Sequence, residues 1–439
     1  MRTYADLHIH SRFARACSPQ LTPENIDLWC RIKGLGLVAT GDFTHPKWFA
    51  ELSQKLEPKG NGLYRLKPEF RQQHPRFTPV AQHEVSFIFG TEVACIYKHA
   101  GSVRRVHHCI FAPSLEAAGK ISAELVRRGK NIASDGRPIL GLTSKALLEL
   151  ILEVDKACVL IPAHIWTPWF AIFGSKSGYD SIQECFEELT PHIFAVETGL
   201  SSDPPMNWRV SALDSVALVS HSDAHSLPNL GREADVFEGE LSYQSVMQAL
   251  REGNPKSVAR GGQRSATKLT GTVEFFPDEG RYHYDGHRAC KVCLHPSEAK
   301  KKNNLCPVCG RELTIGVLSR VEDLADRAMG VKPAGVLAYT GLLELDKLLA
   351  EAQGVKGRTA KAADNLYWDL VSFGGGELPL LLNSSLESLA TVASERICEA
   401  FSRLRAQQVE LTPGYDGEYG SVRLFKPEEQ VGRLQISLF

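Results

Sequence analysis

The sequence of 439 residues predicts an α/β fold, in which a distorted (β/α)7-type barrel precedes a small cysteine-rich module and a helical C-terminal domain. Two observations favour the barrel: strand-like apolar runs alternate with helical segments, and the apolar runs lead to His, Asp or Glu residues. The third observation is length, since a chain of this size exceeds one typical core and favours two or three domains.

The first predicted strand leads to His8 and His10, which are separated by one apolar residue. Residues two apart in a strand point to the same face, so both imidazoles converge on one point. A second run, ending in Leu218, Val219 and Ser220, leads to Asp223 and His225. These two distant segments therefore predict two walls of one metal site.

The strand-like runs between these segments each lead to further potential ligands. In chain order these are Asp42 and His45, Glu92, His107 and His108, His164, and Glu197. In α/β barrels, reactive groups collect at the C-terminal ends of parallel strands, where we expect all of them to lie. Strand alternation lets only one of the adjacent pair, His107 or His108, face a shared site, and the sequence leaves that choice open.

This set is larger than one ion needs, so we expect a cluster of two or three divalent ions. Mixed imidazole and carboxylate ligation favours Zn, Mn or Fe over Ca or Mg. Zinc is the expected ion, with Mn or Mg as the alternatives. Helical stretches fill the gaps between strands: Pro23 to Lys33 follows a Thr22 cap, and Lys145 to Val154 follows Ser144.

Four of the 11 cysteines form two C-x-x-C pairs, Cys290 with Cys293 and Cys306 with Cys309, separated by twelve residues. This spacing is typical of a zinc ribbon in which four thiolates close the coordination sphere. We therefore expect one structural zinc that takes no part in chemistry. Residues 281–311 also carry seven Lys or Arg against two acids, which favours either a contact with phosphate or a plain solvated face.

Composition excludes few function classes. The net charge is −1, the N-terminus lacks an apolar signal region, and no stretch reaches 18 apolar residues. We expect a cytoplasmic protein without membrane contact. From about residue 319 the pattern becomes helical, in 321–328, in 342–353 and in one longer helix over 385–409. The predicted domains are residues 1–280, 281–318 and 319–439.

Taken together, the motifs resemble those of the polymerase and histidinol phosphatase (PHP) superfamily of metal-dependent phosphoesterases. The matching segments are Asp6 to His10, the region of Asp42, Gly90 to Glu92, the strand of His107 and His108, Pro162 to His164, and Ser222 to His225. The sequence departs from the superfamily pattern where Phe43 follows Asp42 in place of a histidine, and where Ala16 and Cys17 stand near an expected ligand. This departure puts the third ion in doubt.

A PHP barrel followed by a zinc module and a helical region resembles, more closely, the endonuclease Q family of DNA repair nucleases. That resemblance implies hydrolysis of the phosphodiester on the 5′ side of uracil, hypoxanthine, xanthine or an abasic site in double-stranded DNA. The rival interpretations are a PHP phosphatase acting on a small phosphomonoester and a non-catalytic nucleic-acid-binding protein. The zinc module and basic segments disfavour the first rival, and the nearly complete ligand set disfavours the second.

The resemblance also implies roles for the ligands. We expect the catalytic residues His8, His10, Glu92 and Asp223 to hold one ion, with Glu92 bridging to a second ion on His164 and one of the adjacent histidines. His45 and His225 remain for a third ion. A metal-activated hydroxide would attack phosphorus directly, so no covalent intermediate is expected.

Two further segments have candidate partners. The loop after His164 would contact an extruded nucleotide, or would pack its aromatic side chains under the barrel mouth. Its candidate substrate-binding residues are Trp166, Trp169, Phe170, Ser175, Lys176 and Tyr179. The tail Gln435 to Phe439 resembles a sliding-clamp motif, with a terminal strand or a disordered tail as the alternative. We expect a monomer.

Overall fold

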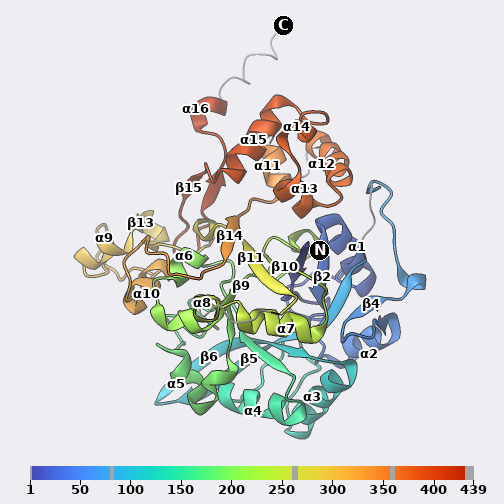
Figure 1. Ribbon diagram of the computed structural model, residues 1–439. Helices are drawn as coiled ribbons and strands as arrows, with labels where there is room; N and C mark the ends of the chain where they lie inside the picture. The colour runs from blue at the N-terminus through green and yellow to red at the C-terminus, as the bar shows by residue number, and fades with distance from the viewer. Residues whose placement is uncertain (1, 80–83, 260–264, 356–360, 431–439) are drawn as a thin grey trace.

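The computed structural model describes residues 2–79, 84–259, 265–355 and 361–430, and shows a mixed α/β fold (Figure 1). The strands are β1 (Arg2–Asp6), β2 (Leu35–Ala39), β3 (Leu56–Pro58), β4 (Tyr64–Leu66), β5 (Ser86–His99), β6 (Ser102–Ala112), β7 (Val159–Pro162), β8 (Ala195–Glu197), β9 (Ala217–Val219), β10 (Ala234–Glu238), β11 (Lys268–Glu274), β12 (Asp285–His287), β13 (Val292–Leu294), β14 (Ala338–Gly341), β15 (Glu410–Thr412) and β16 (Ser421–Arg423). The candidate tail Gln435 to Phe439 lies outside the described residues.

The helices alternate with strands in the first half of the chain and dominate its last third. They are α1 (Pro23–Lys33), α2 (Pro46–Lys55), α3 (Leu115–Arg127), α4 (Ser144–Val154), α5 (Ile182–Phe186), α6 (Pro204–Asn207), α7 (Tyr243–Glu252), α8 (Pro255–Ala259), α9 (Pro296–Lys301), α10 (Val317–Leu324), α11 (Leu345–Gln353), α12 (Lys361–Gly374), α13 (Glu377–Asn383), α14 (Leu386–Leu389), α15 (Glu395–Arg405) and α16 (Pro427–Gln430). None of the described helices is long and apolar enough to cross a membrane.

A ten-stranded mixed sheet forms the centre of the molecule, with the strand order β14-β11-β10-β1-β2-β5-β4-β3. Off this path, β6 pairs with β5, and β7 pairs with β6. Backbone contacts continue this path around a ring. Ile165 donates to the carbonyl of Glu197, which links the end of β7 to β8, and β8 pairs with β9 in parallel. Beyond β9, Ile9 and Ala224 form a parallel bridge that returns the ring to the extension of β1.

The prediction that the ligands lie at the ends of parallel strands is wrong for part of this ring. β1, β2 and β5 pair in parallel, but β5 and β6 form a long antiparallel hairpin, and β10 is antiparallel to β1. Glu92 therefore lies within β5 rather than after it, and His107 and His108 lie within β6. Parallel neighbours need a long crossover, whereas the short connection from His99 to Ser102 permits only a hairpin.

Local sequence signals explain the helix boundaries. α1 begins after Thr22, whose hydroxyl accepts from the Asn25 N–H as predicted, and ends at Gly34 in the left-handed conformation with φ 80°. α4 begins one residue earlier than predicted, because Thr143 rather than Ser144 is its N-cap. Both helices pack apolar side chains into the continuous core under the sheet.

The C-terminal helices gather beyond one edge of the sheet (Figure 1). The helix predicted over 321–328 is found four residues earlier as α10, and the helix predicted over 342–353 is found as α11. The single helix predicted over 385–409 is wrong, because it divides into α14 and α15. Ser394 at the break has an extended backbone with φ −70° and ψ 159°, and it starts α15 as an N-cap residue.

The C-terminal third contacts earlier parts of the chain at several points, which include a strand pairing and a buried ion pair. β14 pairs in parallel with β11, so the main sheet includes a strand from beyond residue 319. Lys33 at the end of α1 forms an ion pair of 2.6 Å with Glu377 at the start of α13, and both side chains are at most 6% exposed. Glu377 also accepts from the Tyr367 hydroxyl at 2.7 Å.

Candidate metal centre

His8 and His10 follow β1 and direct their Nε2 atoms toward the same two carboxylates. His10 Nε2 lies 3.1 Å from Asp223 Oδ1 and 3.2 Å from Glu92 Oε2, and His8 Nε2 lies 3.6 Å from each of these oxygens. Four ligand atoms from His8, His10, Glu92 and Asp223 all lie within 4.8 Å of one another. This first group can hold one metal ion.

The second oxygen of Glu92 faces another group. Glu92 Oε1 lies 2.7 Å from His107 Nδ1 and 3.0 Å from His164 Nε2, and the two imidazole nitrogens are 3.4 Å apart. These three ligand atoms form a second set within 4.8 Å of one another. Because Glu92 offers a different oxygen to each set, its carboxylate can bridge two neighbouring ions.

The chemistry of the first group also fits a metal ion, independently of the distances between its ligand atoms. His8 Nε2 is fully buried and has no hydrogen-bond partner among the described residues. An unpaired buried imidazole nitrogen is costly unless a ligand satisfies it. Burial alone would raise the pKa of Glu92, but the charges of His107 and Arg137 hold that pKa well below its usual range. An ionised carboxylate facing imidazole nitrogens is suited to a divalent transition metal.

Strand alternation in β6 separates the two adjacent histidines. His107 faces Glu92 and His164, whereas His108 points to the opposite side of the strand, where its Nε2 lies 2.8 Å from Ser144 Oγ. The choice that the sequence left open therefore falls on His107, and the structure contradicts His108 as a ligand. Burial lowers the pKa of His107 to about 4 and that of His108 to about 3, so both rings are neutral at pH 7.

Two predicted ligands lie behind the histidines instead of beside them. Glu197 Oε1 is 3.0 Å from His8 Nδ1, and Asp42 Oδ1 is 2.9 Å from His10 Nδ1. The second oxygens are occupied as well, since the His164 N–H donates to Glu197 and the Ser11 N–H donates to Asp42. A carboxylate on Nδ1 fixes the ring orientation and leaves Nε2 toward the metal. Asp42 and Glu197 thus orient ligands in this structure.

The set predicted for a third ion does not assemble. His45 Nε2 lies 3.1 Å from the Ala133 carbonyl oxygen, and its ring stacks on Phe13 at 4.5 Å, away from the two groups. His225 remains at the mouth, with its ring 4.7 Å from that of His10, but the described residues provide no group in which it joins His45. His45 is the N-cap residue of α2 and its ring points to the Ala133 carbonyl, outside both ligand sets, so its role as a metal ligand stays a prediction.

Backbone strain marks three of the site residues. Asp42, His164 and Asp223 have positive φ angles of 43°, 29° and 47°. Residues other than glycine seldom adopt this region, and such strain concentrates at functional sites. Gly199 allows the turn at His164, because a Cβ there would lie 2.5 Å from the His164 Cβ. Apolar periodicity and motif spacing do not reveal backbone strain of this kind.

Several further residues of the centre lie outside the predicted set. His221 joins two carboxylates, with Nδ1 at 2.9 Å from Glu197 and Nε2 at 3.2 Å from Asp235. Burial lowers the pKa of His221, but Asp235 and Glu197 together raise it to about 10. Arg137 contacts Glu92, and Cys109 lies beside His8 and Glu197. His221 directly precedes the Ser222 to His225 motif, and that proximity was the available signal.

The aromatic loop divides into buried and exposed positions. Trp166 is fully buried and donates to Asn207, and Tyr179 is 2% exposed and bonded to Tyr97, which favours the packing alternative for these two residues. Trp169 is 39% exposed, and the Phe170 ring lies 4.6 Å from that of His107. Ser175 and Lys176 are exposed in the same loop. The four accessible residues remain candidates for substrate contact.

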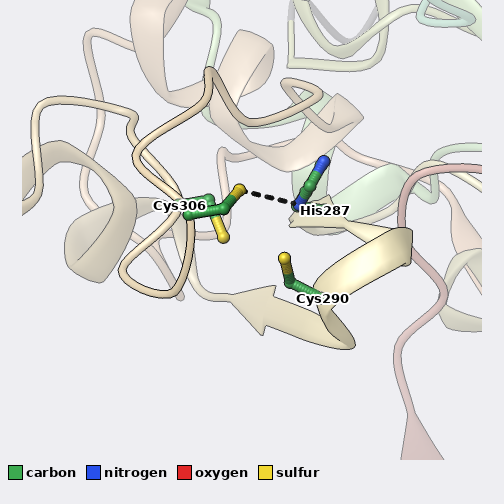
Figure 2. Close-up of side chains that lie close together, drawn as sticks. His287, Cys290 and Cys306 are labelled. Atoms are coloured by element: carbon green, nitrogen blue, oxygen red, sulfur yellow. Dashed lines mark hydrogen bonds between the residues drawn. The ribbon is translucent and has the colours of Figure 1, made fainter.

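A separate metal-ligand group lies between β12 and α10. It contains His287, Cys290, Cys306 and Cys309, whose ligand atoms lie within 4.8 Å of one another. Figure 2 shows His287, Cys290 and Cys306 pointing toward one another from β12, from the turn after it and from the loop after α9. Burial would raise the pKa of the Cys306 thiol, but the backbone N–H groups of Cys309 and Val308 lower it to about 6, which favours a thiolate.

Cys293 does not belong to this group, although the C-x-x-C spacing predicts it. In the β12–β13 hairpin His287 pairs with Val292 and Gly286 pairs with Cys293. Residues paired across a hairpin share a face, so Cys293, next to Val292, points away from His287. Its Sγ lies 3.9 Å from the Pro413 carbonyl oxygen. The structure thus groups His287 with three of the four predicted cysteines, and Cys293 as the fourth thiolate ligand stays a prediction.

Comparison with known proteins gives relatives along the sequence. No family model matches the chain. It is 29% identical over 436 residues to YqxK of Bacillus subtilis, covering 96% of this chain and 99% of that protein. It is also 30% identical to MJ0043 of Methanocaldococcus jannaschii over an aligned region of 285 residues, and this region covers 64% of this chain. The aligned region is only 34% of the length of the M. jannaschii protein.

Two solved structures are similar to the whole chain. One is the lesion-specific endonuclease PfuEndoQ from Pyrococcus furiosus, with 29% identity, a TM-score of 0.82, and coverage of 98% of this chain and 97% of that one. The other is endonuclease Q in complex with a 27-mer duplex with an abasic lesion at the active site, with 29% identity, a TM-score of 0.80 and coverage of 100% of both chains. The chain is therefore similar along its whole length to endonuclease Q, in sequence and in fold.

Proposed function

We propose that this protein is a metal-dependent DNA repair endonuclease that hydrolyses the phosphodiester on the 5′ side of a deaminated base or an abasic site. The observation that carries the proposal is the similarity to endonuclease Q bound to a lesion-containing duplex, which extends over the full chain. The arrangement of Glu92 between two ligand sets supports the chemistry.

The two ligand sets define the working centre of the proposed enzyme. His8, His10, Glu92 and Asp223 would hold one ion, and Glu92, His107 and His164 would hold the other. Divalent ions in these positions would supply a hydroxide nucleophile at neutral pH and would neutralise charge on the phosphodiester. Glu197 and Asp42 hold His8 and His10 in the orientation that this arrangement requires. Zinc is the proposed ion, with Mn or Mg as the alternatives.

We also propose the division into a distorted (β/α)7 barrel over residues 1–280, a zinc module over 281–318 and a helical region over 319–439. The ring through β1, β2, β5, β6, β7, β8 and β9 supports the barrel. The small core cluster around Val292, Ala299, Cys306 and Leu313 supports a separate module. A core of this size needs a metal or another cross-link for stability.

The test of the proposed activity uses labelled duplexes that each contain one uracil, hypoxanthine or abasic site, with an undamaged duplex and a generic phosphomonoester alongside. We expect a single nick on the 5′ side of the lesion, in the damaged strand, only when divalent ions are present. Hydrolysis of the phosphomonoester without nicking would show a phosphatase instead. Binding to duplexes without hydrolysis of either substrate would show a non-catalytic protein.

The proposed zinc module gives a separate expected result. His287→Ala should remove one zinc per chain, because three thiolates alone leave the ion open to water. Cys293→Ser, the matched control in the same hairpin, should retain that zinc, since its thiol lies outside the group. Zinc content measured by elemental mass spectrometry on both purified variants decides the point. Retention by His287→Ala together with loss by Cys293→Ser would restore the four-cysteine set.

A further inference from the structure

Arg137 places a positive charge against the candidate metal centre without itself belonging to a ligand set. Its Nη1 donates to Glu92 Oε2 at 3.0 Å, which is the same oxygen that faces His8 and His10. The side chain is 25% exposed, as is that of Asp223, while Glu92 is fully buried. Arg137 and Asp223 thus lie where the centre meets solvent, on the side from which a substrate must approach.

The backbone holds Arg137 firmly at this position. The following residues form a single parallel β-bridge with β5, since the Ala94 N–H donates to the Pro138 carbonyl and the Leu140 N–H donates to the Ala94 carbonyl, both at 2.9 Å. On the other side, the Gly136 N–H donates to the Phe13 carbonyl at 3.0 Å. A Cβ at Gly136 would lie 2.4 Å from Asp42 Oδ2, so this segment packs directly against the centre.

The donor capacity of Arg137 is largely unused. A guanidinium has five N–H donors in a planar fork, and Glu92 is its only hydrogen-bond partner among the described residues. The charges of Glu92 and Asp223 raise its pKa further above the ordinary value, so the group stays charged. The side chain is partly exposed, so the remaining donors are available to a ligand, and a planar fork of this kind matches the oxygens of a phosphate.

The charge balance calls for an anion at this point. In the described arrangement Arg137 offsets the charge of Glu92, and divalent ions in the two ligand sets would take over that role. Glu92 alone, shared between the guanidinium and two divalent ions, offsets only part of this positive charge, so a further anion beside Arg137 is favoured. The anion that the proposed reaction brings there is the phosphodiester. Fixed cations that meet charge developing on a phosphoryl group are a strong source of transition-state stabilisation.

We propose that Arg137 is a catalytic residue that binds a non-bridging oxygen of the scissile phosphate. The proposal rests on the proposed endonuclease function, because it assigns a substrate contact within that same site. Glu92 orients the guanidinium, and the strand contact through Ala94 fixes its distance from both ligand sets. Arg137 therefore neutralises the phosphate before cleavage and stabilises the additional negative charge that develops as the nucleophile attacks.

A binding experiment tests the contact without using activity. The linkage cut by the wild-type protein is first mapped, and duplexes are then made with either a normal phosphate or an uncharged methylphosphonate at that linkage. Affinities are measured in the Asp223→Asn background, which is expected to bind without cutting. Removing the phosphate charge should weaken binding by about tenfold or more when Arg137 is present, as for a charge-assisted contact. In the double variant Asp223→Asn with Arg137→Ala, the same replacement of the phosphate should change the affinity by less than about twofold.

The matched control is Arg128→Ala, because Arg128 pairs with Glu124 at the end of α3 and lies outside both ligand sets. This variant should respond to the methylphosphonate as the parent does. Equal losses of affinity with and without the Arg137 side chain would overturn the proposal. A wild-type protein that nicks none of the duplexes would instead show that the proposed function fails, so the two failures are distinguishable.

Kinetics provide a second measure that a purely structural role would not reproduce. Arg137→Ala should lower kcat by about 10²–10³-fold, the usual cost of removing one donor to a developing negative charge. Added guanidine should restore part of the lost rate, and Arg137→Lys should retain more activity than Arg137→Ala. Metal content and thermal unfolding should match the wild type. A loss of rate that follows loss of bound metal, without rescue by guanidine, would assign Arg137 to support of Glu92 alone.

Discussion

Replacing Asp223 with asparagine is expected to lower strand cleavage by at least about a thousandfold, about 4 kcal/mol of the barrier. Asp223 Oδ1 lies within 3.6 Å of both His8 Nε2 and His10 Nε2, so it completes the first ligand set. The surrounding imidazoles hold the pKa of this carboxyl well below its usual range despite its burial. An amide keeps the shape of the side chain but loses the charge that binds a cation.

Binding of the damaged duplex should remain close to that of the wild type, because the change removes one charge and leaves the surface otherwise intact. Cleavage rates over a series of Zn and Mn concentrations, together with affinities from fluorescence anisotropy, provide the measurement. Glu116→Gln is the matched control, since Glu116 is an exposed carboxylate on α3. Near-wild-type nicking by Asp223→Asn at saturating metal would remove Asp223 from the centre.

Replacing Glu377 with alanine is expected to cost about 3–5 kcal/mol in the free energy of unfolding. Glu377 Oε2 lies 2.6 Å from Lys33 Nζ, and the two side chains are 5% and 6% exposed. Removing the carboxylate leaves the Lys33 ammonium buried without its counter-ion and removes an acceptor of the Tyr367 hydroxyl. Breaking one side of a buried pair is far more costly than losing an exposed pair.

Urea unfolding followed by circular dichroism measures this loss. Glu116→Ala is again the control, since its pair with Lys120 is exposed on both sides, and its unfolding midpoint should match the wild type. Replacement of both members of the buried pair by apolar residues of similar volume should recover much of the stability. An unchanged midpoint for Glu377→Ala would show that water reaches Lys33.

The sequence predicted the members of the centre better than their roles. His8, His10, Glu92, His164 and Asp223 were found because each lies on or just after an apolar strand-like run. The roles of Asp42 and Glu197 could not be predicted, because an imidazole can face a carboxylate through either nitrogen. Only the three-dimensional arrangement shows that these two carboxylates lie on Nδ1, behind the rings.

The differences between expectation and structure have identifiable physical causes. Spacing alone placed Cys293 among the zinc ligands, but the register of the β12–β13 hairpin turns its side chain to the other face. Arg137 was missed because it lies in an irregular segment, where no periodicity applies, and because its partner Glu92 is 45 residues away. The helix expected over 385–409 is interrupted at Ser394, because this residue has an extended backbone that the apolar periodicity does not reveal.

The position of β14 has a consequence for how the protein is made. β14 covers the edge of β11, and it is synthesised only after residues 281–318. Until residues 338–341 emerge from the ribosome, β11 presents an open strand edge, which is a site for incorrect pairing with other chains. The central sheet is therefore complete only late in translation, and truncated chains that end before β14 should be cleared or aggregate rather than accumulate as unregulated nucleases.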